Sequence, residues 1–409
     1  HKHSIFLEGG HEDLRFGLNL IYSNNDGVMK ESSRNNTGVE FSIDYRLGNF
    51  QIKDKIVYQQ TKSKESPYGS FSEYTKKLPY DKYKDENGNY LAQTTRWNNE
   101  FAGNGKDAIN PLWEATLSSF DRTKDELIEN ELGINWFITS YLLAKGTFKL
   151  SKTISDGKIF VDPKSKKNTN PLSATNLTSG SLTQRDGKSA SWEFTANLSY
   201  NRSVENHNIN FNLGMNGSSS DSQSTTTIYE GFPSGIFSSP NYAEKVSEKP
   251  SNSKDVSHLI GFIGLLNYSY NDVYLLDASI RTDGSSKFGH NKKWALYWSG
   301  GVGINLHNYD FAKNIGWLNL LKLRTSYGLT GNVSFSPYEA QTMYKTIDDE
   351  WYKTGYGATL IALGNEDLGW EKKYKTNFGI DFDIFNGILN LSADYYIEKT
   401  VDMVNDVTI

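Results

Sequence analysis

Apolar and polar residues alternate with a period of two over many short segments of this chain. Near the C-terminus, the arms 378–384 and 389–395 carry an apolar residue at almost every second position. Asn386 and Gly387 lie between the two arms, and both residue types tolerate the positive φ angles of a tight turn. The pattern therefore predicts a β-hairpin with one apolar face and one polar face.

The same alternation recurs along most of the chain. It predicts strands over the following ranges: 14–22, 39–46, 50–58, 132–136, 142–150, 192–200, 209–215, 260–270, 274–280, 298–306 and 321–329. With the two arms of the C-terminal hairpin, the chain holds about fourteen strands. Several approach the roughly 9–11 residues that a tilted strand needs to cross a membrane.

Short and long connections alternate between these strands. The tight turns include Leu47-Gly48-Asn49, Asn271-Asp272 and Asn386-Gly387, and the long polar stretches are 59–130, 151–190, 216–257 and 330–371. In an antiparallel sheet, alternate connections lie at opposite ends. We therefore expect all the tight turns at one end and all four long loops at the other, as in a transmembrane barrel.

Two all-β architectures fit the alternation. A transmembrane barrel turns its apolar face to lipid, whereas a soluble all-β protein turns it to a shared core. Aromatic residues near many strand ends favour the barrel because they suit its two interfacial girdles. On that reading, Phe41, Phe194, Leu198, Phe211, Leu213, Phe378 and Phe382 point outward to lipid. Glu40, Asn197, Asn210 and Asp381 point to the lumen.

Composition narrows the function classes. The chain has 409 residues, no cysteine and a formal net charge of −5, and 13% of its residues are aromatic. The absence of cysteine excludes disulfides and thiolate metal sites. The mild acidity, without a basic stripe, argues against a nucleic-acid partner. The sequence shows no combination of nucleophile and base, so we expect no enzyme, no cofactor and no metal site.

Three segments carry a family resemblance. Residues 280–294 read IRTDGSSKFGHNKKW, residues 320–332 read LLKLRTSYGLTGN, and residues 364–372 read GNEDLGWEK. The last is followed by a strand with Tyr395-Tyr396 and Lys399-Thr400. In this order and spacing, the segments resemble the SusC-like (SusC/RagA) class of TonB-dependent outer-membrane transporters.

The resemblance implies a barrel of about 22 strands. It also implies TonB-dependent import of a glycan or oligopeptide across the outer membrane of a Gram-negative bacterium, with a SusD-like surface lipoprotein as partner. We expect residues 1–409 to form one barrel fragment, without the plug region that contacts the TonB complex and without the C-terminal barrel strands. Two alternatives stay open: an adhesin or binding protein on the same barrel, and a soluble β-rich carbohydrate-binding protein or enzyme.

Candidate binding residues are loop aromatics, because aromatic faces stack on sugar rings and on apolar peptide side chains. We name Tyr80, Tyr90, Trp97 and Trp113 in the first long loop. The competing interpretation is that such rings form the small core of the loop itself.

Two further groups of residues are interpreted as structural. Residues 81–88 weakly resemble a calcium loop, but they are better read as a polar turn. The charged residues Arg281, Asp283, Lys287 and Arg324 are expected to maintain the fold at strand ends.

Overall fold

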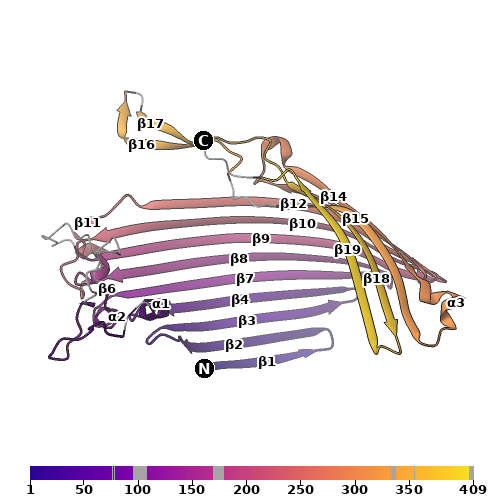
Figure 1. Ribbon diagram of the computed structural model, residues 1–409, viewed down its shortest axis with the longest axis horizontal. Helices are drawn as coiled ribbons and strands as arrows, with labels where there is room; N and C mark the ends of the chain where they lie inside the picture. Colours follow the sequence, from indigo (N-terminus) through magenta and orange to yellow (C-terminus); the bar gives the residue numbers. More distant parts are fainter. Residues whose placement is uncertain are drawn as a thin grey trace.

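The computed structural model describes residues 1–75, 77, 79–94, 108–168, 179–332, 338–353 and 355–404. One antiparallel sheet dominates this part of the chain (Figure 1). It contains 15 strands, of which 14 follow one another across its width from β1 to β19, while β11 pairs with β10. The predicted all-β architecture and the predicted number of strands are confirmed.

The strands of the main sheet are long. They are β1 (Lys2–His11), β2 (Leu14–Asp26), β3 (Ser33–Leu47), β4 (Phe50–Lys64), β7 (Phe120–Thr139), β8 (Leu142–Val161), β9 (Ser181–Val204), β10 (His207–Glu230), β11 (Lys245–Val246), β12 (Ser251–Tyr270), β13 (Tyr274–Ser285), β14 (Trp294–Asn305), β15 (Leu318–Asn332), β18 (Glu371–Ile384) and β19 (Leu389–Val401). Every neighbouring pair is antiparallel, as in the pairing of β9 with β10.

Small elements lie in the connections. They are α1 (Phe71–Thr75), α2 (Pro111–Glu114), α3 (Asp310–Lys313), the pair β5 (Gln93–Thr94) and β6 (Ala108–Ile109), and the hairpin β16 (Met343–Tyr352) and β17 (Gly355–Ala362). Short 3-10 helices lie at Lys166–Asn168, Pro240–Tyr242, His290–Lys292 and Leu306–Asn308. Within the described ranges, no helix is both long and apolar enough to cross a membrane.

The two ends of the sheet differ, as predicted. The tight turns after β3, β12 and β18 all lie at one end, and their residues take positive φ angles: 56° at Gly48, 57° at Asn271 and 85° at Gly387. The connections after β4, β8, β10 and β15 lie at the other end, which we call the loop end. The prediction that tight turns and long loops segregate is therefore confirmed.

The predicted loop boundaries are wrong. The first three connections are 65–119, 162–180 and 231–250, shorter than the predicted 59–130, 151–190 and 216–257. The fourth, predicted as the loop 330–371, contains the hairpin β16–β17. Strands β9 and β10 have 24 residues each, about twice a membrane span. Their outer halves continue the ladder, as in the pairs Thr226 with Arg185 and Thr226 with Ser251. Both faces are polar there, so the alternation in hydropathy disappears while the backbone hydrogen bonds persist.

The two faces of the sheet differ in polarity. The apolar set Phe41, Leu198, Phe211, Leu213 and Phe378 is exposed, and each of these side chains is at least 36% accessible. None of them belongs to the small buried cluster of Phe160, Leu182 and Phe232. The described residues thus form no shared interior core of the kind that a soluble sandwich needs. The outward facing predicted for these five residues agrees with their exposure, whereas Phe194 and Phe382, predicted to face the same way, are half-buried.

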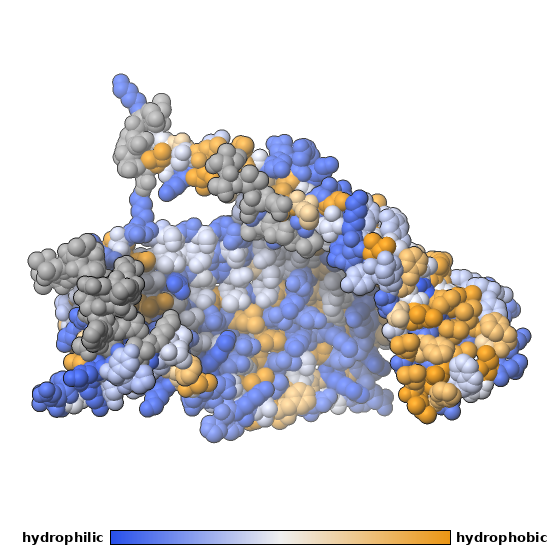
Figure 2. Space-filling view, viewed as in Figure 1, coloured by the Kyte–Doolittle hydropathy of each residue, from blue (hydrophilic) through white to orange (hydrophobic). Residues whose placement is uncertain are grey.

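Polar residues occupy the opposite face. Lys55 pairs with Glu40 at 3.3 Å, and Lys149 pairs with Glu129 at 3.1 Å. The sheet is bent into a trough, and Figure 2 looks into it: the distant concave surface is mainly blue and white. The near surface of the C-terminal strands is mainly orange. The concave side is therefore the polar wall, and the convex side is the apolar face.

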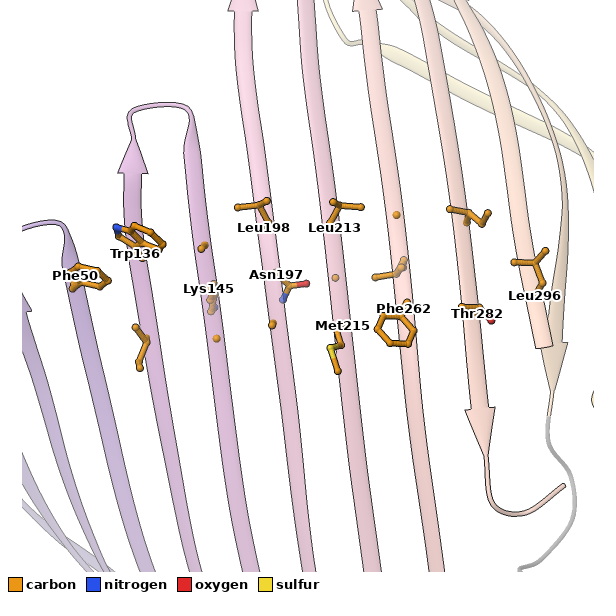
Figure 3. A pocket seen from close by; sticks show the side chains of 18 residues that line it. Phe50, Trp136, Lys145, Asn197, Leu198, Leu213, Met215, Phe262, Thr282 and Leu296 are labelled. Atoms are coloured by element: carbon orange, nitrogen blue, oxygen red, sulfur yellow. The ribbon is translucent and has the colours of Figure 1, made fainter. Parts of the chain in front are cut away.

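A broad apolar hollow of about 860 Å³ spans the middle of the sheet (Figure 3). Its lining includes the large residues Phe50, Trp136, Leu213, Phe262 and Leu296, most of which share the apolar face. The small residues Ala144, Gly146 and Ala196 contribute to the same lining. Such a surface is suited to contact with lipid chains rather than with water.

Candidate functional site

The loops at the loop end share a small core of their own. Phe160 and Leu182, at the ends of β8 and β9, are each 1% accessible and pack with Phe232. The ring centroids of Phe160 and Phe232 lie 5.2 Å apart in an edge-on arrangement. Phe160 and Leu182 flank the connection 162–180, and Phe232 lies in the connection 231–250. Phe120, just after the connection 65–119, packs against the cluster, which therefore joins these three loops into one rim. We call this joined set of loops the loop rim.

Buried carboxylates fasten the first loop to the second. Glu114, at the end of α2, is 3% accessible. It accepts hydrogen bonds from the Ser165 hydroxyl at 2.6 Å and the Lys166 backbone N–H at 2.8 Å. Asp162 accepts from the Ser118 backbone N–H at 3.1 Å. Each bond satisfies a buried polar group that would otherwise be costly to bury.

Asn110 organises the stretch that carries the predicted tyrosines. Its amide oxygen caps α2 by accepting from the Leu112 N–H at 3.1 Å. Its amide nitrogen donates to the carbonyls of Tyr83 at 3.0 Å and Leu91 at 2.7 Å. One buried side chain therefore fixes both the start of the helix and the two flanks of the turn 84–90.

The turn 84–90 is held by a carboxylate. Asp85 accepts from the Asn89 backbone N–H at 2.8 Å, and Gly88 takes a φ of 86°. The hydrogen bonds from the Asn89 side chain and backbone lower the pKa of Asp85 below its usual value. The Gly88 N–H also donates to the Asp85 carbonyl at 3.1 Å, so residues 85–88 form a tight turn, in line with the polar-turn interpretation of residues 81–88.

The four predicted binding residues lie in different settings. Tyr80 is 76% exposed, and Tyr90 is exposed with the Lys84 ammonium 4.9 Å from its ring centroid. Trp113 is half-buried within α2. Trp97 lies outside the described residues. Their role in binding stays a prediction, and of the three described residues Tyr80 and Tyr90 are the exposed ones.

The three resemblance segments meet at the loop end of β13, β14, β15 and β18. Trp370 stacks against Phe288 with ring centroids 4.2 Å apart, and it meets Tyr297 edge-on at 5.7 Å. The Tyr297 ring lies over Gly331, where a Cβ would come within 2.3 Å of it. Phe288 and Trp370, from the first and third segments, thus pack with Tyr297 of β14, and Tyr297 in turn needs Gly331 of the second segment. We call this contact the latch.

Backbone hydrogen bonds complete the latch. Gly289 N–H donates to the Leu368 carbonyl at 3.0 Å, and Asn291 N–H donates to the Glu366 carbonyl at 3.2 Å. The connection after β13 is therefore bonded directly to the stretch before β18. Sequence reasoning used these segments only as a resemblance and missed their contact, although their glycines and tryptophan were a usable signal.

The charged residues of the segments form ion pairs within the polar wall. Arg281 binds Asp283 at 2.7 Å, and Arg324 binds both Asp381 at 3.0 Å and Asp394 at 2.7 Å. These pairs agree with the expected fold-maintaining role of Arg281, Asp283 and Arg324. For Lys287, the structure gives a backbone contact, in which its N–H donates to the Ser285 hydroxyl at 3.3 Å.

Comparison with known proteins gives a consistent result. No protein-family model matches the chain. TonB-dependent receptor P39 of Formosa agariphila is 27% identical over 99% of this chain and 38% of its own length. TonB-dependent receptor SusC of Bacteroides thetaiotaomicron is 33% identical over 37% of this chain and 16% of its own length. The chain thus spans well under half the length of these relatives.

Solved structures match the fold. The structure of the RagAB peptide transporter superposes with a TM-score of 0.80 at 21% identity, and the match covers all of this chain and 45% of that chain. The RagAB peptide importer in its open-open state gives a TM-score of 0.81. These named relatives are receptors and transporters, not enzymes. The chain is therefore a β-barrel wall sequence related to the SusC-like class of TonB-dependent receptors.

Proposed function

We propose that the complete protein imports a glycan or oligopeptide nutrient across the outer membrane of a Gram-negative bacterium. One observation carries the proposal: a sheet with an apolar convex face, a polar concave face and all long loops at one end. Relatives named TonB-dependent receptor, which align over 99% of the chain, support it.

The composition of the polar wall favours a hydrogen-bonding oligomer as substrate. The concave side of β10 carries Asn208, Asn210, Asn212, Asn216, Ser218, Ser220, Ser222 and Ser224. Short amides and hydroxyls can exchange hydrogen bonds with sugar hydroxyls or peptide groups, which replaces the water that such a substrate loses. The peptide transport named for RagAB fits this chemistry, and so does a glycan.

We assign one proposed partner to each end of the barrel. The TonB complex would act from the turn end through a plug region, and a SusD-like lipoprotein would cover the loop rim. The rim is suited to such contacts because its loops are fixed by the Phe160 core and by Glu114, so binding groups are held in place. We assign substrate contact to Tyr80 and Tyr90, and to Trp97 and Trp113 as further candidates.

Tyr80→Ala combined with Tyr90→Ala is expected to raise the substrate concentration for half-maximal uptake at least about tenfold, because two exposed aromatic contacts are lost. Uptake at saturating substrate and the amount of protein in the outer membrane should not change. The pair Trp97→Ala and Trp113→Ala is measured in the same way. Phe311→Ala is the matched control, because this exposed ring lies at the turn end.

Dependence on TonB tests the import function itself. Uptake by cells that express the complete protein should stop when TonB is deleted, while binding of substrate to the cell surface persists. Uptake that continues without TonB would contradict the proposed function. Normal half-maximal concentrations in both aromatic pairs would remove these four residues from the binding site but leave the import function standing.

A further inference from the structure

A group of cations lies on the convex face near the loop end. We call Lys62, Lys64, Arg122, Lys124 and Lys158 the basic patch. The strand register sets Lys62 directly opposite Lys124, Lys64 opposite Arg122, and Arg122 opposite Lys158. Like charges that face each other across a ladder destabilise a sheet. Such an arrangement is favoured when an anion lies between the cations.

The carboxylates nearby pair with only three of the five cations in the basic patch. Lys124 pairs with Glu126 at 2.7 Å, Lys64 with Glu31 at 3.3 Å, and Lys158 with Asp156 at 3.9 Å. The Arg122 guanidinium lies over the Phe120 ring at 4.6 Å. For Lys62 and Arg122, no carboxylate partner is found in the described part of the chain. Both of these side chains are exposed.

The basic patch continues the apolar face rather than the polar wall. Lys62 lies four residues beyond Tyr58 on β4, and Lys124 lies four residues beyond Ile128 on β7, so each pair shares one face. Four residues of strand correspond to about 13 Å. The basic patch thus lies just beyond the apolar band, at the depth where lipid head groups are expected.

The surface there is hollowed. A groove of about 380 Å³ is lined by all five cations together with Asn35, Phe120 and Asp156. Phe120, which packs on Phe160 of the loop core, bounds the groove on the side away from the apolar band. The groove therefore lies between the lipid-facing surface and the loop rim.

We propose that the basic patch binds the phosphorylated head groups of outer-leaflet lipid. A phosphate supplies the anion that Lys62 and Arg122 lack, and the Arg122 guanidinium can hold it through two parallel hydrogen bonds. Direct continuity with the lipid-facing band favours a lipid over a soluble acidic protein. The inference rests on the proposed outer-membrane location, and it does not depend on which nutrient is imported.

The test uses the complete protein, purified in detergent and titrated with bis-phosphorylated lipid A while native mass spectrometry counts the bound lipid. Lys62→Gln combined with Arg122→Gln should weaken binding about 25-fold, since each cation near an anionic surface contributes a factor of about five. The matched control is Lys53→Gln with Lys145→Gln, which removes the same charge from the polar wall and should leave binding unchanged. Inorganic phosphate and dephosphorylated lipid A serve as further probes.

Three results would overturn the inference. The first is that the Lys62 and Arg122 double variant binds lipid A as tightly as the wild type. The second is that the wild type binds dephosphorylated lipid A as tightly as bis-phosphorylated lipid A. The third is that the double variant keeps its lipid binding but loses a co-purified acidic protein. Weak binding of inorganic phosphate compared with lipid A would support the lipid as the source. Cell fractionation separates the import function from the lipid-binding proposal. If the double variant reaches the outer membrane, imports normally and binds lipid as before, only the lipid-binding proposal is refuted.

Discussion

Leu213→Arg is expected to destabilise the barrel by about 2–4 kcal/mol, the cost of a cation near the middle of the lipid-facing band. Leu213 is 47% exposed on the convex face, where it lines the apolar hollow beside Met215. Its cross-strand neighbours, Leu198 and Gly264, are also apolar or small. The guanidinium would therefore find no partner there. The measurement is the free energy of unfolding of the complete protein in lipid vesicles, obtained by urea titration.

Asn212→Arg is the matched control, one residue away on the polar wall. Asn212 donates to Asn210 at 2.6 Å, so its replacement costs about one neutral hydrogen bond, about 1 kcal/mol. The two variants differ in facing but not in charge, strand or depth. If Asn212→Arg cost as much as Leu213→Arg, the assignment of the two faces would be wrong.

Gly289→Ala is expected to open the latch and to lower stability by about 1–3 kcal/mol, the usual cost of overpacking. A Cβ at this position would lie 2.0 Å from the Glu366 carbonyl oxygen, which is a backbone atom and cannot rotate away. The hydrogen bonds from Gly289 to Leu368 and from Asn291 to Glu366 would lengthen or break. Hydrogen exchange of the residue 289 and Asn291 amides measures the opening directly.

Gly300→Ala is the control for the latch. Gly300 lies within β14, and nothing lies within 4 Å of a Cβ at this position, so this change should leave exchange at residues 289 and 291 unaltered. Unchanged protection in Gly289→Ala would show that the two loops are held together by other contacts. A loss of protection without any loss of import would show that the latch stabilises the barrel but is not needed for transport.

The strands and their facing could be predicted because alternation is a local signal. In β10, the residues from Ile209 to Met215 alternate clearly, and the structure places them as predicted. The outer half of the same strand, from Ser218 to Thr227, could not be recognised because it is polar on both faces. Its strand structure depends on neighbours that supply the hydrogen bonds, not on a contrast in hydropathy.

The alternation of apolar and polar residues could not predict contacts between distant segments. Asp54 interrupts the apolar face of β4, and the structure shows it accepting a hydrogen bond from Asn130 of β7 at 2.6 Å. The latch likewise joins Gly289 with Glu366, and Tyr297 with Gly331. Such pairs depend on register and loop path, which the hydropathy of a single strand does not specify. Tyr80 and Trp113 can be picked out by residue type from the sequence, but only the structure separates the exposed ring of Tyr80 from the half-buried ring of Trp113.

The most direct test of the account is a spin-label scan along β10 of the complete protein in lipid vesicles. This chain has no cysteine, so single cysteines at positions 209 to 216 introduce the label on a clean background in this segment. A barrel wall should give a period of two, with labels at 209, 211, 213 and 215 relaxed by lipid-soluble oxygen. Labels at 210, 212, 214 and 216 should be shielded from oxygen and more accessible to a water-soluble nickel complex. Equal relaxation of both sets by the nickel complex, or an absence of any period, would contradict a barrel wall with lipid on one side and a polar lumen on the other.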